Sequence, residues 1–440
     1  MPAEQPHRIS LAAATAIVVA CMVGTGVFTS LGFQLGSMPS GFPILLLWAV
    51  GGVVALCGAF SYAELTAMMP RSGGEYHLVG QAYHPLIGFL AGWVSITAGF
   101  SAPIAITAMA FGKYVNDLWP GIDARFAGFG VVALLTMLQL GGVRFIARFH
   151  VGLTIMRVLL IVAFVAGAIF LGTHPLNWSV LAPKSGDMKQ VFSSPFANSL
   201  FYVMYAYSGW NGAVYVAGEM NHPQRNLPLA LLLGTLGVML LYLALNAVFL
   251  VGGDWNAMRN QEDVGLIAAR GIFSERGSAW MGGLIAFGLL STVNAMLWTG
   301  ASTLRVIGRD MRALCWLDSS DRRGEPVGAV LFMTNLVLLL LGTGSFQSLL
   351  DYTQALLQLS AALCVFAVIW LRFRKPNAPR PFKVPFYPVP PVIFLGVSLW
   401  MFWVMVDQKP KESAWGAATL LIGVILFFAS NRSSDEQPDI

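Results

Sequence analysis

The sequence predicts an all-α integral membrane protein that crosses the bilayer many times. Of its 440 residues, 56% are hydrophobic and only 11% are charged, whereas about 25% of the residues in an ordinary soluble domain carry a charge. Apolar stretches of the length that a spanning helix needs, about 20 residues, follow one another along the chain. Two of them are interrupted near the middle by glycine and polar residues. These observations favour a helical bundle with its functional site inside.

Taken in order, the apolar stretches predict twelve membrane helices. Their expected ranges are 9–35, 42–69, 80–116, 124–142, 149–172, 194–218, 227–251, 279–308, 326–342, 346–372, 387–407 and 413–430. An even number places both termini on one side. The loops and tails of that side hold sixteen Lys and Arg residues, against nine on the opposite side. The positive-inside rule therefore predicts a multi-pass cell-membrane protein with both termini in the cytoplasm.

The first expected helix is broken within VACMVGTGVFTS, residues 19–30, by Gly24-Thr25-Gly26. Glycine in a helix interior costs roughly 1 kcal/mol relative to alanine. A break at this depth also frees N–H and carbonyl groups that hydrocarbon cannot solvate. The half-helix after the break points N–H groups at the gap, which suits a carboxylate, and the carbonyls before it suit an ammonium. A zwitterion would satisfy both sets of groups.

The sixth expected helix repeats this anomaly in YAYSGWNGAV, residues 205–214. Interrupted helices at matching places in two halves of a chain indicate an inverted-repeat transporter with its site at the membrane midplane. We therefore expect repeats over 9–172 and 194–372, with two further helices over 387–430. The longest connections are too short to bury a core of their own, so residues 1–440 should form a single membrane domain.

Several other classes of protein are disfavoured. Four cysteines without CxxC spacing and no histidine cluster predict neither a metal site nor a cofactor. The sequence shows no nucleophile–base set of the kind that an enzyme needs. It also shows no ring of polar residues of the kind that lines a channel. The net charge of +5 is spread over short loops, so nucleic acid is not an expected partner. Residues 1–8 are too polar for a signal peptide, so we expect the first helix to be retained.

A set of motifs resembles the amino acid–polyamine–organocation superfamily, and is most similar to the L-type amino acid transporters and their bacterial relatives. The motifs, in chain order, are GTGVF, YAELTAMMPRSGGEYH, YAYSGWN, GEMNHPQRNLP, STVNAMLWTGASTLRVIGRDM and RPFKVPFYPVPP. The resemblance extends from about residue 8 to 430. It implies a LeuT-type fold of five plus five helices, an α-amino acid as substrate, and alternating access by rocking of helix pairs.

The resemblance also suggests which residues bind the substrate. The N–H groups of Thr25 and Gly26 and the Thr25 hydroxyl are candidates for the carboxylate, and the carbonyls of Met22, Tyr205 and Ser208 for the ammonium. The alternative is that the glycines only permit close helix packing. Tyr205 stands where L-type transporters usually carry phenylalanine, so it is a candidate gate. Its added hydroxyl departs from the family pattern. This departure weakens the expectation that the site shares the family's preference for substrates with large apolar side chains.

Further polar residues are weaker candidates. Ser291 and Asn294, together with Gln354 and Gln358, either line the side-chain pocket or join helices to one another. Ser101, Ala102 and Ile106 are candidates for another wall of the pocket. Glu64 and Glu219 are candidates for gating pairs with Arg71 or Arg225, although solvated helix-end charges are the commoner arrangement.

The expected substrate is a neutral amino acid, because the first, third, sixth and eighth helices have no Asp or Glu near mid-depth. A carrier of cationic amino acids or polyamines should place a carboxylate in the pocket. Such a carrier and a proton-coupled symporter remain alternatives. So does a sensor that binds an amino acid without moving it.

Arg157 stands where L-type relatives place a lysine whose ammonium replaces a sodium ion. A fixed cation there is expected to hold carbonyls near Gly24 and the hydroxyl of Ser291 or Thr292. The alternative is that Arg157 reaches to the cytoplasmic interface beside Arg148. Guanidinium does not cycle its proton at physiological pH. We therefore expect sodium-independent exchange or facilitated diffusion without proton coupling through this residue.

The resemblance also bears on partners. Animal relatives bond to a heavy chain through an extracellular cysteine. Cys21, Cys57, Cys315 and Cys364 all lie outside the predicted outer loops. We therefore expect no disulfide-linked partner, and membrane lipid as the surroundings of the bundle.

Overall fold

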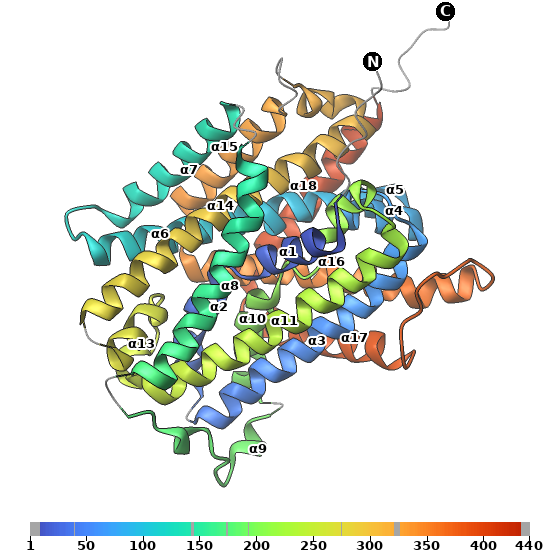
Figure 1. The fold of residues 1–440 in the computed structure, drawn as a ribbon. Helices are drawn as coiled ribbons and strands as arrows, with labels where there is room; N and C mark the ends of the chain where they lie inside the picture. Colours follow the sequence, from blue (N-terminus) through green and yellow to red (C-terminus); the bar gives the residue numbers. More distant parts are fainter. Residues whose placement is uncertain are drawn as a thin grey trace, which may run out of the picture.

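The computed structural model describes residues 9–38, 40–141, 145–172, 175–191, 193–273, 275–320 and 326–432. Every regular element in these ranges is helical, and one isolated parallel bridge joins Ile9 to Met220. Figure 1 shows long helices packed side by side, with α1 and α10 near the middle and α9 at one end. The all-helical membrane class is confirmed. The two terminal tails, on which the predicted cytoplasmic placement bears, lie outside the described residues.

Eight helical stretches in the described part of the chain are long and apolar enough to cross a membrane. They consist of α1 (Leu11–Met22) with α2 (Gly26–Ser37), α3 (Gly41–Met68), α5 (Pro85–Val94) with η1 (Ser95–Ser101) and α6 (Ala102–Leu118), α11 (Pro223–Gly252), α14 (Glu275–Asp310), α16 (Phe346–Arg374), α17 (Val389–Gln408) and α18 (Pro410–Arg432). Each agrees with an expected range to within a few residues at most ends. The agreement matters most for α1 and α2, because the expected break lies between these two helices.

The other helices are either further apolar helices or short connecting segments. Apolar ones are α7 (Ala124–Leu140), α8 (Phe145–Leu171), α10 (Ser194–Tyr207) and α15 (Val327–Thr343). Connecting ones are α4 (Gly74–Ala82), η2 (Trp178–Leu181), α9 (Asp187–Gln190), η3 (Gly212–Glu219), α12 (Trp255–Met258), α13 (Val264–Ile272) and η4 (Arg312–Asp318). All lie along the chain between or beside the spanning stretches.

Two expected ranges differ from the structure. The helix expected over 80–116 begins instead at Pro85, because His84 is extended and proline favours the first helical position; the residues before it form the separate helix α4. Its interior also contains the π-helical segment η1, which the sequence did not predict. The helix expected over 194–218 ends at Tyr207, and its remainder is the 3-10 helix η3.

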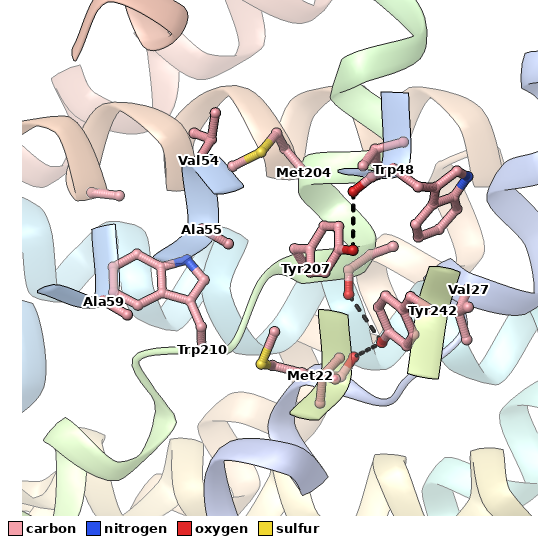
Figure 2. Packing of buried hydrophobic residues seen from close by; sticks show 14 of the residues in the cluster. Met22, Val27, Trp48, Val54, Ala55, Ala59, Met204, Tyr207, Trp210 and Tyr242 are labelled. Carbon is pink, nitrogen blue, oxygen red and sulfur yellow. Dashed lines mark hydrogen bonds between the residues drawn. The ribbon is translucent and has the colours of Figure 1, made fainter. Parts of the chain in front are cut away.

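A buried aromatic group holds the centre of the bundle together. The ring of Tyr242 on α11 lies 5.6 Å from Trp48 on α3 and 5.2 Å from Tyr207 at the end of α10. The Tyr207 hydroxyl donates to the Trp48 carbonyl at 3.1 Å, as Figure 2 shows. Aromatic pairs at these separations add stability beyond the area they bury. The group therefore fixes α10 against α3 and α11, next to the break that follows Tyr207.

Candidate functional site

The first break lies between Met22 and Gly26, as expected. Helix α1 ends at Met22, and α2 begins at Gly26. The Gly24 N–H turns back to the Met22 carbonyl at 2.8 Å. In the described part of the chain, no hydrogen bond uses the N–H groups of Thr25 or Gly26. The start of α2 therefore offers two free donors at the positive end of a helix, which suits an anionic group.

The second break follows α10. The Ser208 N–H donates to the Tyr205 carbonyl at 3.0 Å, and Gly209 adopts φ of 91°. This left-handed conformation favours glycine, because a Cβ there is strained. The chain resumes helical geometry at Gly212, whose N–H bonds to the Gly209 carbonyl at 2.8 Å. Ser208 is half-buried at this turn.

The two breaks lie against each other. A Cβ added to Gly26 would lie 2.5 Å from the Cα of Ala206, and one on Gly209 would lie 2.5 Å from the carbonyl oxygen of Cys21. Real Cβ atoms essentially never approach so closely. The glycines therefore permit close packing of α2 on α10 and of the second break on α1. This is the packing that the alternative interpretation of the glycines expected, and the binding of a substrate at the same place stays a prediction.

Tyr205 lies at the junction of the two breaks. Its side chain is buried, and its hydroxyl oxygen is 3.5 Å from the Thr25 hydroxyl oxygen. The structure thus brings the candidate gate beside the candidate carboxylate site. The hydroxyl that distinguishes Tyr205 from the usual phenylalanine makes this contact.

The Met22 carbonyl, a candidate for the ammonium, already has a strong partner. The Tyr242 hydroxyl lies 2.7 Å from the Met22 carbonyl oxygen and 3.2 Å from the Ala206 carbonyl oxygen (Figure 2). The Gly24 N–H is a second donor to this oxygen at 2.8 Å, so both lone pairs of the Met22 carbonyl are already used in this arrangement. Sequence reasoning missed Tyr242; the only signal was a tyrosine within the otherwise apolar α11.

Arg157 lies beside the first break. Its side chain on α8 is only 5% exposed, and its Nη1 atom donates to the carbonyls of Val23 at 3.2 Å and Ala20 at 3.5 Å. The acceptors near Gly24 are therefore the carbonyl of the residue directly before it and that of Ala20, one turn earlier on α1. The alternative in which Arg157 reaches to the interface is wrong, because the guanidinium is buried. The Arg148 side chain lies outside the described residues.

The hydroxyls of Ser291 and Thr292 on α14 take no part in this contact. The Thr292 hydroxyl donates to the carbonyl of Gly288 in its own helix at 3.1 Å. Ser291 is buried, and no hydrogen bond among the described residues joins it to Arg157. Thr292, Gly24 and Arg157 nevertheless line one narrow, mostly apolar cavity. The structure thus gathers these predicted residues, whereas a bond from Arg157 to the hydroxyl of Ser291 or Thr292 is not found among the described contacts and stays a prediction.

Other polar candidates mainly join helices. Asn294 accepts hydrogen bonds from the Gln139 amide on α7, through its carbonyl at 3.1 Å and its side chain at 3.4 Å. Gln354 donates to Gln358 at 3.0 Å, which donates to Ser398 on α17 at 2.7 Å. These contacts favour the alternative in which the residues hold helices together. Ser101, at the end of η1, differs because its buried hydroxyl has no hydrogen-bond partner among the described residues.

The structure contradicts both interpretations of Glu64, which is neither a solvated helix-end charge nor a partner of Arg71. Glu64 is buried and bonded by Arg372 at 3.0 Å, with Arg380 at 3.3 Å. Arg71 lies 3.2 Å from Asp310 instead. Buried carboxylates need paired cations, and the arginines of α16 and of the following loop supply them. The exposed Glu219 fits the solvated helix-end alternative. Among the described residues, no group of His, Cys, Asp and Glu is arranged to hold a metal ion.

Comparisons with known proteins agree over nearly the whole chain. A family model described as amino acid permease matches residues 9–427. The b(0,+)-type amino acid transporter 1 of Mus musculus is 25% identical over 435 residues, 96% of this chain and 87% of the relative. The large neutral amino acids transporter small subunit 2 of Rattus norvegicus is 28% identical over 439 residues, 96% and 80% of the two chains. The cystine/glutamate transporter of Homo sapiens is 25% identical over 434 residues, 96% and 85%.

Proposed function

Because the chain belongs to the amino acid permease family, we propose that it carries neutral L-amino acids across the cell membrane by alternating access. The observation that carries this proposal is the contact between the two helix breaks, where free N–H groups at Thr25 and Gly26 lie near the carbonyls that end α10. The substrate carboxylate binds the N–H groups, and the substrate ammonium binds the carbonyls of Tyr205 and Ser208, and that of Met22 in place of the Gly24 N–H. Tyr205 closes over the bound zwitterion.

The preference for neutral side chains rests on the distribution of carboxylates. The acidic residue that contacts the second break in the described part of the chain is Glu75, which accepts a hydrogen bond from Asn211 at 2.9 Å. Glu75 also accepts from Tyr62 and Ser360. Three neutral donors of the protein thus already engage its oxygens and hold it among α3, α16 and the second break. The relative named a large neutral amino acids transporter is consistent with this preference.

The proposed architecture is the LeuT type, with twelve helices in repeats over 9–172 and 194–372 and two further helices over 387–430, in one domain. Both termini lie in the cytoplasm. Under this topology Cys315, which is exposed on η4, faces the cytoplasm. A disulfide to an extracellular partner chain therefore has no cysteine to use among the described residues.

The proposed mechanism needs no sodium, because the Arg157 guanidinium supports the end of α1 where a sodium ion would otherwise lie. An arginine also keeps its proton at physiological pH, so this residue carries none across the membrane. The transport mode is exchange or facilitated diffusion.

Uptake of labelled leucine or alanine into proteoliposomes tests the function. We expect uptake that is saturable and unchanged when sodium is replaced by choline. Uptake that rises when the vesicles contain unlabelled amino acid indicates exchange, and equal uptake into empty vesicles indicates facilitated diffusion. Binding of amino acids by the purified protein without any uptake would contradict transport and favour a sensor.

A further inference from the structure

Glu75 is a buried carboxylate without a cationic partner. It lies on α4 and is 2% exposed. The Tyr62 hydroxyl donates to it at 2.5 Å and the Asn211 amide at 2.9 Å, and the Ser360 hydroxyl is a third donor. No ion pair in the described part of the chain includes Glu75. An ionised carboxylate in such a place is costly unless a proton or a cation neutralises it.

The groups around Glu75 do not supply a positive charge. The titratable side chains that face it are Tyr62 on α3, Tyr215 on η3 and Cys364 on α16. Phenols and thiols are neutral near pH 7 when unperturbed. Burial raises the pKa of Glu75 above its ordinary value, and its hydrogen-bond donors, which include Ser95 on η1, offset only part of that rise.

The partners of Glu75 connect α4 to parts of the molecule that the proposed cycle must move. Asn211 belongs to the second break, three residues beyond Ser208. Ser360 lies on α16, and Tyr62 packs edge-on against Trp210 with ring centroids 4.5 Å apart. Separation of the second break from α4 would remove the Asn211 donor and hydrate the carboxylate. The affinity of Glu75 for a proton therefore depends on the position of this break.

We propose that Glu75 is a proton-binding site that links the arrangement of the second break to pH. The carboxylate takes one proton from the aqueous side on which α4 lies, and the neutral carboxyl then donates to the Ser360 hydroxyl, which accepts equally well. The proton returns to the same side when the break leaves α4, so no proton crosses the membrane. The link to transport rests on the proposed function, whereas the proton site itself does not.

Linkage fixes the direction of the effect. Glu75 binds its proton more tightly in the arrangement described here than in an unfolded or opened chain, where its pKa is near the ordinary value. The stabilisation is therefore complete below the ordinary glutamate pKa, about 4.3, and is lost as the pH rises through the raised pKa. Acid favours this arrangement, and a pH above the raised pKa of Glu75 releases it.

Thermal unfolding of the purified full-length protein across this pH range tests the site without any transport assay. We expect the wild-type midpoint to fall by several degrees as the pH rises, and Glu75→Gln to lack this component. Glu219→Gln, which changes an exposed carboxyl at the end of η3, should keep the wild-type slope. Parallel pH profiles of the wild type and Glu75→Gln would overturn the proposal.

A second variant keeps the proposal testable if Glu75→Gln does not fold. Tyr62→Phe retains the ring against Trp210 but removes a donor that favours the ionised carboxylate. Its pH profile should therefore move to higher pH. An unchanged profile, or a shift to lower pH, would show that Glu75 is not the titrating group.

Exchange assays at equal pH on both sides of the vesicle membrane test the link to transport. We expect wild-type exchange to slow several-fold on acidification, because leaving this arrangement requires release of the proton, and Glu75→Gln to be insensitive to pH. Equal pH sensitivity of both proteins contradicts the link. If no protein transports amino acids, the proposed function fails, while the unfolding profiles still decide whether Glu75 binds the proton.

Discussion

The Nη1 atom of Arg157 lies 3.2 Å from the carbonyl oxygen of Val23, at the residue where helix α1 has just ended. A helix end leaves carbonyls without intrahelical partners, and at this depth water does not replace them. The guanidinium supplies donors to this carbonyl and to that of Ala20. A residue from α8 thus stabilises the interruption on which the proposed substrate site depends.

Arg157→Ala should lose transport. Removing the guanidinium leaves two buried carbonyls unpaired, at a cost of about 1–3 kcal/mol for each unsatisfied group, and frees α1 from α8. We expect uptake near background and a lower thermal midpoint, with sodium unable to restore activity.

Arg71→Ala is the matched control, because the Arg71 side chain is 57% exposed in its surface pair with Asp310. Surface pairs contribute about 0–1 kcal/mol, so its stability should stay near wild type. Full activity of Arg157→Ala, or strict dependence of the wild type on sodium, would refute the assigned role of Arg157.

The sequence predicted the positions of both breaks, because glycine and polar residues within apolar helices leave few structural alternatives. It did not predict which side chains meet there. Tyr242 reaches the Met22 carbonyl from a helix 220 residues away in the chain, and no local pattern encodes such a contact. Asn294 is a polar residue on a spanning helix, and only the packing of α7 against α14 reveals that Gln139 is its partner.

Tyr242→Phe tests the contact that sequence reasoning missed. The substitution keeps the ring against Trp48 and Tyr207 but removes the hydroxyl that joins the Met22 and Ala206 carbonyls. Loss of a buried donor to two carbonyls should destabilise the protein by about 1–3 kcal/mol. Thermal unfolding measures this loss, and a midpoint equal to that of the wild type would contradict it.

The substrate class predicts a pattern of competition. Alanine, serine and leucine should inhibit uptake of a labelled neutral amino acid more strongly than arginine, glutamate or putrescine, because the described carboxylate that contacts the second break, Glu75, is already engaged by three neutral donors of the protein. Stronger inhibition by any charged compound would reverse the assignment.

The carboxylate itself can be tested with a substrate analogue in which a neutral amide replaces the carboxylate and the amino group is kept. Leucinamide lacks the negative charge that the N–H groups of Thr25 and Gly26 are proposed to bind. Hydrogen bonds to charged groups contribute about 1.5–3 kcal/mol, so leucinamide should compete at least roughly tenfold less strongly than leucine. Equal competition would show that the first break does not bind the carboxylate.

Substitution of Gly26 should abolish transport, with a severity that follows side-chain size. A Cβ at this position meets the Cα of Ala206 at 2.5 Å and its main-chain nitrogen at 3.1 Å, so even Gly26→Ala must push α2 away from α10. Gly26→Val adds two further methyl groups and should eliminate uptake while the protein still inserts into the membrane. Uptake assays combined with membrane fractionation measure both properties.

Gly237→Ala is the control that separates packing from helix propensity. Gly237 lies within α11, and an added Cβ there meets nothing within 4 Å. Replacing glycine by alanine in a helix interior is worth about 1 kcal/mol in favour of the helix, so this variant should be at least as stable as the wild type and fully active. The contrast arises because Gly26 faces the main chain of α10 whereas Gly237 faces open space. Normal uptake by correctly inserted Gly26→Val protein would show that the close approach of the two breaks is not needed for transport.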